Sequence, residues 1–299
     1  MPPTVVLLGV FAVACVPAAR RLAAADWPSR CPVAAIALWQ ALGLSWGLAA
    51  VAALAAFGFS GLTAPGGASL RRWGPLVVVH LLSLAASAAL FTLLCWILAA
   101  AVAAVLRARH RQRTLLGLLA HDDPKVPGAL VVDHPAAAAY CVPGLRSAIV
   151  ISAGALNLLD TDELAAVLAH ERAHLRARHD LVLLPFTALL RAFRWSATAR
   201  AANAEVALLV EMLADDRARK RRPARELATA LLRVGASGGG LAPAGALAAT
   251  GSALDGELAA RVARLLRPPP GLPTPMIVGI ALLTALVLLA PATVFLVPL

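Results

Sequence analysis

Acidic residues are almost absent from the first 121 residues of the 299-residue chain. Of the 16 Asp and Glu residues in the sequence, only Asp26 precedes Asp122. The whole chain is 60% hydrophobic, with a mean hydropathy of +0.79, which is too apolar for an ordinary soluble domain. The N-terminal part and the middle of the chain are therefore different kinds of polypeptide.

Cysteine and tyrosine are also rare, and each scarcity excludes a class of protein. The four cysteines show no C-x-x-C spacing and are too sparse for a disulfide framework, so we interpret them as packing residues. There is one tyrosine to stack on a base and no zinc-finger signature, which argues against nucleic-acid binding. The net charge of +11 is carried almost wholly by arginine, much of it beside apolar stretches, and this indicates membrane orientation instead.

Four apolar stretches predict helices that span a lipid bilayer. They cover about residues 3–19, 33–58, 75–106 and 276–298. The first stretch is short, and a cleaved signal peptide is the alternative interpretation. We favour an anchor, because no positive charge precedes this stretch and Arg20 and Arg21 follow it.

These stretches divide the chain into three predicted domains. Residues 1–106 contain three transmembrane helices, residues 107–270 form a polar domain, and residues 271–299 contain the fourth transmembrane helix. Within the polar domain, strand-like segments alternate with helical patterns. We therefore expect a mainly α integral membrane protein with an α+β domain between its third and fourth helices.

The distribution of arginine predicts the orientation in the cell membrane. One side would carry most of the basic residues that flank the spans, and the opposite side would carry only Arg71 and Arg72. The basic side is expected to be cytoplasmic, so the polar domain would be cytoplasmic and both termini would lie outside. The residues assigned to the cytoplasmic side are Arg20, Arg21, Arg30, Arg107, Arg109, Arg111, Arg113, Arg261, Arg264 and Arg267.

An H-E-x-x-H motif lies in a predicted helix from Thr161 to Arg178. His170 and His174 are four residues apart, so both can point a ring nitrogen at one metal ion from the same helix face. Glu171 is set about 100° round the helix axis from His170. This places Glu171 beside the metal rather than on it, in the position of a base that takes a proton from water.

A second predicted helix, from Asn203 to Arg221, offers a third metal ligand. Glu211 would complete a His-His-Glu set and leave the fourth position open, which is typical of a catalytic zinc site with one Zn²⁺ per chain. Zinc is preferred over other divalent metals by ligand type alone. Asp215 lies one turn after Glu211 and is placed to accept the free ring N–H of a ligating histidine.

Three further elements near the motif are candidates for substrate handling. Ala139, Tyr140, Cys141 and Val142 read as a strand that could bind an extended substrate at a sheet edge, although a plain packing hairpin fits equally well. His179 and Arg172 are candidate oxyanion stabilisers. For His179 we favour a structural role.

These motifs together resemble those of the membrane-embedded zinc metallopeptidases. The resemblance is carried by His170 to His174, by His179-Asp180, by Glu211 to Asp215, and by the strand-like segments at 139–144 and 149–152. The layout of three spans, a peptidase domain and a final span looks most like the BlaR/MecR antirepressor peptidases. The HtpX and CAAX-prenyl-protease group shares the motifs and is the close alternative.

The resemblance implies a zincin-like fold with His170, His174 and Glu211 as zinc ligands and Glu171 as the base. It implies a protein or peptide substrate: a cytoplasmic transcriptional repressor in signal transduction, or membrane proteins in quality control. The beta-lactam receptors of this group carry a penicillin-sensor domain after the last span. Because the sequence given stops at Leu299, we expect no direct antibiotic sensing.

Two other functional classes fit the sequence less well. A non-catalytic signal transducer would have no reason to keep Glu171 together with all three ligands. A channel or transporter would carry ionisable groups inside its spans, and His80 is the only one within them. The sequence therefore favours a membrane-embedded zinc endopeptidase.

Overall fold

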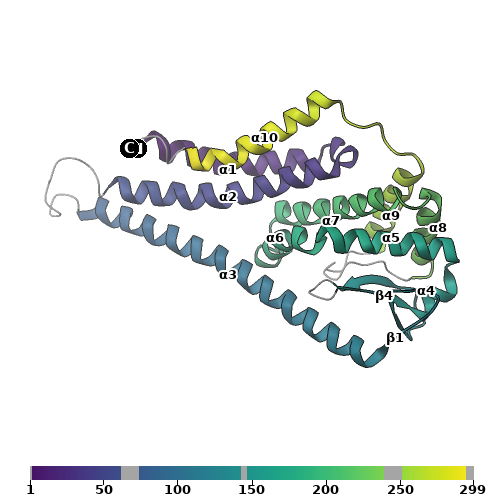
Figure 1. Ribbon diagram of the computed structural model, residues 1–299. Helices are drawn as coiled ribbons and strands as arrows, with labels where there is room; N and C mark the ends of the chain where they lie inside the picture. The colour runs from purple at the N-terminus through teal and green to yellow at the C-terminus, as the bar shows by residue number, and fades with distance from the viewer. Residues whose placement is uncertain (1, 62–73, 143–146, 239–250, 294–299) are drawn as a thin grey trace. The chain divides into compact units, whose positions relative to one another are not determined.

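The computed structural model describes residues 2–61, 74–142, 147–238 and 251–293 (Figure 1). Residues 143 and 144 of the strand-like segment at 139–144, Arg71 and Arg72, and residues 294–298 of the fourth expected span lie outside the described residues. The chain divides into two units. One comprises residues 1–100, 189–205 and 272–299, and the other comprises residues 101–188 and 206–271.

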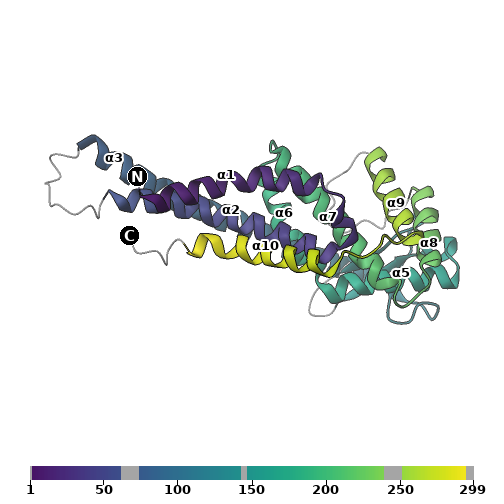
Figure 2. The ribbon, with the colours of Figure 1, turned by 90° about the horizontal axis from the view of Figure 1, so that it is seen from above.

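The first unit is built on apolar helices. They are α1 (Pro3–Ala23), α2 (Pro32–Ser60), the first part of α3 (Gly74–Leu119) and α10 (Thr274–Thr293), with a short 3₁₀ helix, η1 (Trp27–Arg30), between α1 and α2. Helix α2 packs against both α1 and α10 (Figure 2). The Ser45 hydroxyl of α2 donates to the Val287 carbonyl of α10 at 2.7 Å, which satisfies a polar group among apolar neighbours.

Four helices in the described part of the chain are long and apolar enough to cross a membrane. They are α1, α2, α10 and the part of α3 from Val77 to Leu119. Each overlaps one of the four predicted stretches, so the number and order of the candidate spans are confirmed at the level of length and composition.

Helix α3 extends well beyond the predicted end of the third stretch at residue 106. It has 46 residues and includes all the arginines from Arg107 to Arg113. Arginine is a good helix former, and no proline occurs between the arginines and Pro124, so the helix continues beyond the apolar stretch. At about 1.5 Å per residue α3 is roughly 69 Å long, more than twice the thickness of a bilayer core.

The second unit contains a four-stranded sheet. Its strands are β1 (Ala120–Asp122), β2 (Leu130–Val132), β3 (Ala139–Val142) and β4 (Ala148–Ser152), in the order β1-β2-β4-β3. Strands β2 and β4 are parallel, whereas the β1–β2 and β3–β4 pairs are antiparallel. Strands β3 and β4 confirm the strand-like segments expected near 139–142 and 149–152. Strand β1 is short and polar, with no alternating pattern in its sequence to predict it.

Helices cover this sheet and form the core with it. Helices α4 (Ala153–Leu158), α5 (Thr161–Ala177) and α8 (Ala224–Ala236) contribute apolar side chains to a cluster with β2, β3 and β4 (Figure 1). Ile151 of β4 and Val167 of α5 are completely buried in this cluster. Helix α9 (Gly251–Leu266) packs against α8, and the remaining helices are α6 (His179–Ala192) and α7 (Ala197–Ala218).

The start of α5 is held by a capping box. The Asp160 carboxylate accepts from the backbone N–H groups of Asp162 and Glu163, and the Glu163 carboxylate accepts from the Asp160 N–H at 3.0 Å. At the other end, Arg178 adopts a left-handed conformation with φ of 51°. The chain therefore turns sharply between α5 and α6, which is where His179 begins the next helix.

Replacing Asp160 with Ala should destabilise the fold, because two N–H groups at the first turn of α5 lose their acceptor. We expect a loss of about 0.5–2 kcal/mol in unfolding free energy. Thermal unfolding of the purified protein would measure it. An unfolding midpoint equal to that of the wild type would show that the capping box does not contribute to stability.

Candidate metal centre

The two histidines of α5 meet at their Nε2 atoms. His170 and His174 are one turn apart on the same face of the helix, and their Nε2 atoms are 3.0 Å apart. Both side chains are buried, with His170 only 1% exposed. Two ring nitrogens that converge in this way inside a protein are arranged to share a ligand.

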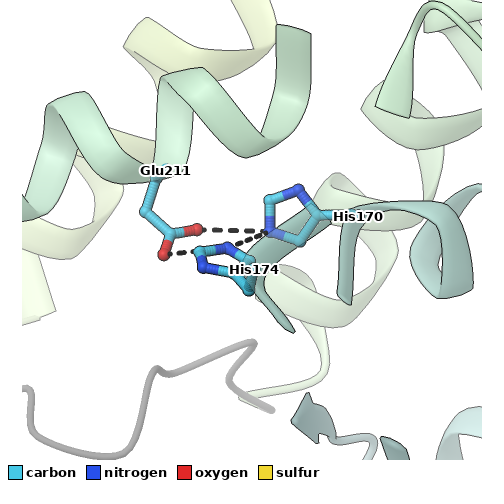
Figure 3. A group of neighbouring side chains, drawn as sticks. All are labelled: His170, His174 and Glu211. Atoms are coloured by element: carbon cyan, nitrogen blue, oxygen red, sulfur yellow. Dashed lines mark hydrogen bonds and ion pairs between the residues drawn. The ribbon is translucent and has the colours of Figure 1, made fainter. Parts of the chain in front are cut away.

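Glu211 of α7 faces both rings. Its Oε2 is 3.4 Å from His170 Nε2, and its Oε1 is 3.5 Å from His174 Nε2. One ligand atom from each of the three residues lies within 4.8 Å of the others. Figure 3 shows the three side chains pointing toward one another from the two helices.

The spacing and chemistry of these atoms fit a zinc ion. Two atoms bound at tetrahedral angles to one zinc, each about 2.0–2.1 Å from it, lie about 3.3 Å apart. The three distances of 3.0, 3.4 and 3.5 Å are close to this separation. Glu211 Oε2 is buried, and an imidazole or carboxylate donor set of this kind is one that zinc prefers. These three side chains could therefore hold a metal ion.

Asp215 lies behind His170, one turn after Glu211 on α7. Its Oδ1 is 2.9 Å from His170 Nδ1, and its side chain is almost completely buried. A carboxylate at this distance can accept a hydrogen bond from the Nδ1–H group, which leaves the lone pair of Nε2 free to bind a metal.

Arg261 of α9 contacts the carboxylates of Glu211 and Asp215 on α7. Its Nε and Nη2 donate to Asp215 Oδ2 and Oδ1, each at 2.9 Å, and its Nη1 lies 3.0 Å from Glu211 Oε2. The sequence analysis used Arg261 only as an indicator of membrane orientation. Its position between Leu258 and Leu265, at helical spacing on the apolar side of α9, is the pattern that could have identified it as a buried residue.

The charges of these groups shift one another's pKa. Burial lowers the pKa of His170, but Asp215 and Glu211 outweigh burial and raise it to about 10. For Glu211 and Asp215, burial raises the pKa, but Arg261 and the hydrogen bonds from histidine outweigh it and lower both values below their usual range. The two carboxylates are therefore ionised at neutral pH.

Glu171 follows His170 and is also buried, at 5% exposure. Burial raises the pKa of its carboxyl, partly opposed by the nearby histidines. The Cys141 thiol of β3 hydrogen-bonds with Glu171, and burial together with this carboxylate raises the pKa of the thiol. Strand β3 thus reaches the side chain that the sequence analysis assigned as the base, through a contact that spacing alone could not predict.

His179 is buried against the second histidine. Its Nδ1 is 3.0 Å from His174 Nδ1, and its Nε2 is 3.3 Å from Arg217 Nη1. Burial, followed by the charges of His174 and Arg217, lowers the pKa of His179 to about 3, so the ring is neutral. No hydrogen bond or ion pair in the described part of the chain joins Arg172 to this group.

Comparison with known protein families identifies the central segment. Residues 105–215 match the model of Peptidase family M48. The matched segment contains His170, Glu171, His174, Glu211 and Asp215, whereas Arg261 lies outside it. No curated protein and no solved structure matches the chain. The match supports an M48-type metallopeptidase and does not distinguish the antirepressor subtype from the HtpX group.

Replacing His179 with Ala should weaken metal binding, because His174 Nδ1 would lose the group that orients its ring. Loss of such a partner typically costs about 10–100-fold in metal affinity. Competition with a zinc chelator would measure the dissociation constant. His134→Ala is the control, because His134 is exposed in the loop after β2. Equal affinity of the His179 variant and the control would contradict the assignment.

Proposed function

We propose that the protein is a membrane-embedded, zinc-dependent endopeptidase. The observation that supports this most strongly is the convergence of His170, His174 and Glu211, with ligand atoms within 4.8 Å of one another, beside the buried Glu171. The match to Peptidase family M48 over residues 105–215 supports the same reaction class.

In the proposed mechanism, His170, His174 and Glu211 would hold the zinc ion. When bound, zinc would polarise the scissile carbonyl and lower the pKa of water to about 7. Glu171 accepts the proton of the attacking water and passes it to the leaving amine nitrogen. Its raised pKa suits both steps, because a carboxyl that titrates closer to neutrality can release the proton as well as accept it.

Strand β3 is the proposed binding site for the substrate backbone. It is the last strand in the order β1-β2-β4-β3, so one of its edges pairs with β4 and the other has no strand partner among the described residues. An extended peptide can add to such an edge by main-chain hydrogen bonds. The contact between Cys141 and Glu171 supports this proposal, because it connects Ala139–Val142 directly with the base.

We further propose that the peptidase region is cytoplasmic, with both termini outside, and that it cleaves a regulator such as a transcriptional repressor. The arginine distribution and the positive-inside rule support the orientation. The layout of three candidate spans, the M48 segment and a fourth candidate span supports the regulatory role by its resemblance to the antirepressor peptidases.

Replacing Glu171 with Gln should abolish cleavage while leaving the fold and the bound zinc in place, because Gln keeps the shape of the side chain but cannot take a proton. We expect a loss of at least about 10²–10⁴-fold in kcat. Glu226→Gln is a matched control on α8, where Glu226 pairs with Arg222. The assay would measure bound zinc and peptide-bond cleavage for both variants in detergent. Full activity in the Glu171 variant would exclude it as the base.

Purified wild-type protein should cleave a folded cytoplasmic repressor at a defined bond. The assay would compare candidate repressors with an unfolded test protein and map the products by mass spectrometry. Cleavage restricted to the unfolded protein would contradict the regulatory role and favour quality control.

A further inference from the structure

We propose that Arg261 is a positioning residue of the metal centre, which holds Glu211 and Asp215 in the arrangement that binds the ion. The proposal rests on the metal centre described above but not on peptide hydrolysis. It also means that α9, which lies beyond the segment matched to Peptidase family M48, is a functional part of the site.

The contacts of Arg261 distinguish it from an ordinary surface arginine. Arg261 is only 7% exposed. Its guanidinium makes two hydrogen bonds of 2.9 Å to Asp215 and an ion pair of 3.0 Å with Glu211. A planar guanidinium is suited to two carboxylates at once because its N–H groups form a rigid fork.

The orientation of His170 depends on this arginine through Asp215. Asp215 Oδ1 accepts from Arg261 Nη2 at 2.9 Å and also lies 2.9 Å from His170 Nδ1. The same guanidinium therefore holds one metal ligand, Glu211, directly and orients another, His170, through Asp215. Without it, two buried carboxylates one turn apart on α7 would repel each other and turn away from these positions.

Positioning and simple charge predict opposite effects on metal affinity. If Arg261 acted only as a positive charge, it would repel the cation, and its removal would strengthen binding. If it positions the ligands, its removal weakens binding. Lys is informative because it keeps the charge but loses the planar fork that reaches both carboxylates.

Arg264 provides a matched control on the same helix. It lies three residues after Arg261 and makes two hydrogen bonds to Asp216, at 2.8 and 2.7 Å. Asp216 follows Asp215 directly, so this pair also fastens α9 to α7. Asp216 is not a member of the group of ligand atoms. Arg264 also donates to the Met212 carbonyl of α7 at 3.5 Å, so its loss tests the contribution of helix docking.

The experiment measures zinc dissociation constants by chelator competition and unfolding midpoints for the full chain in detergent. We expect Arg261→Gln and Arg261→Lys to weaken zinc binding about 10–100-fold. Arg264→Gln should lower the unfolding midpoint about as much as the Arg261 variants do. It should change zinc affinity less than about threefold, since the affinity depends on residues that orient the ligands rather than on docking of α9.

Unchanged or tighter zinc binding in either Arg261 variant would overturn the proposal. So would an equal loss of affinity in Arg264→Gln, since the effect would then come from docking of α9. If Arg261→Gln does not fold, Arg261→Lys decides, because it keeps a positive charge beside the buried carboxylates. Wild-type protein that binds zinc but cleaves nothing would contradict the proposed peptidase function. The zinc affinities of the variants would still test the role of Arg261. Wild-type protein that binds no zinc would overturn both.

Discussion

The meeting of α5 and α7 at His170 is the constraint on which the metal-binding region depends. Each helix presents two functional residues four apart, His170 and His174 on one and Glu211 and Asp215 on the other. A spacing of four residues keeps each pair on one helix face. A single contact between the helices therefore brings Glu211 to the Nε2 atom of His170 and Asp215 to its Nδ1 atom. A shift of either helix by one residue would break both contacts together.

The charged groups at this crossing contribute little net stability, because desolvation offsets much of the attraction between buried ions. Stability comes instead from the apolar cluster beside them. Val167 of α5, Ile151 of β4 and Val234 of α8 are buried there, and each such side chain contributes about 1.5–3 kcal/mol. The sheet and α8 thus hold α5 in place, which lets its adjoining face carry groups that cost energy to bury.

The local features of the site could be predicted from the sequence because they depend on helical periodicity. The shared face of His170 and His174, the capping box at Asp160, and the relation between Glu211 and Asp215 all follow from residues three or four apart. The four candidate spans follow from length and hydropathy. Strand β1 could not be predicted, because three residues with one apolar side chain carry no periodic signal.

Contacts between segments that are distant in the sequence could not be predicted from helical periodicity. Arg261 is 46 residues from Asp215 and reaches it only because α9 folds back against α8. The contact of Cys141 with Glu171 likewise depends on the packing of β3 against α5. In both cases the sequence indicates the element, but the partner is determined by tertiary packing.

The burial of Glu171, Glu211, Asp215 and Arg261 also determines the charge of an ion that this centre can accept. Three carboxylates and one guanidinium leave two negative charges, which a divalent cation neutralises and a monovalent one does not. The raised pKa of His170, which Asp215 and Glu211 cause against the effect of burial, expresses the same imbalance, because holding a proton is the other way to neutralise the site. Metal uptake is therefore an exchange in which protons leave as a doubly charged ion enters.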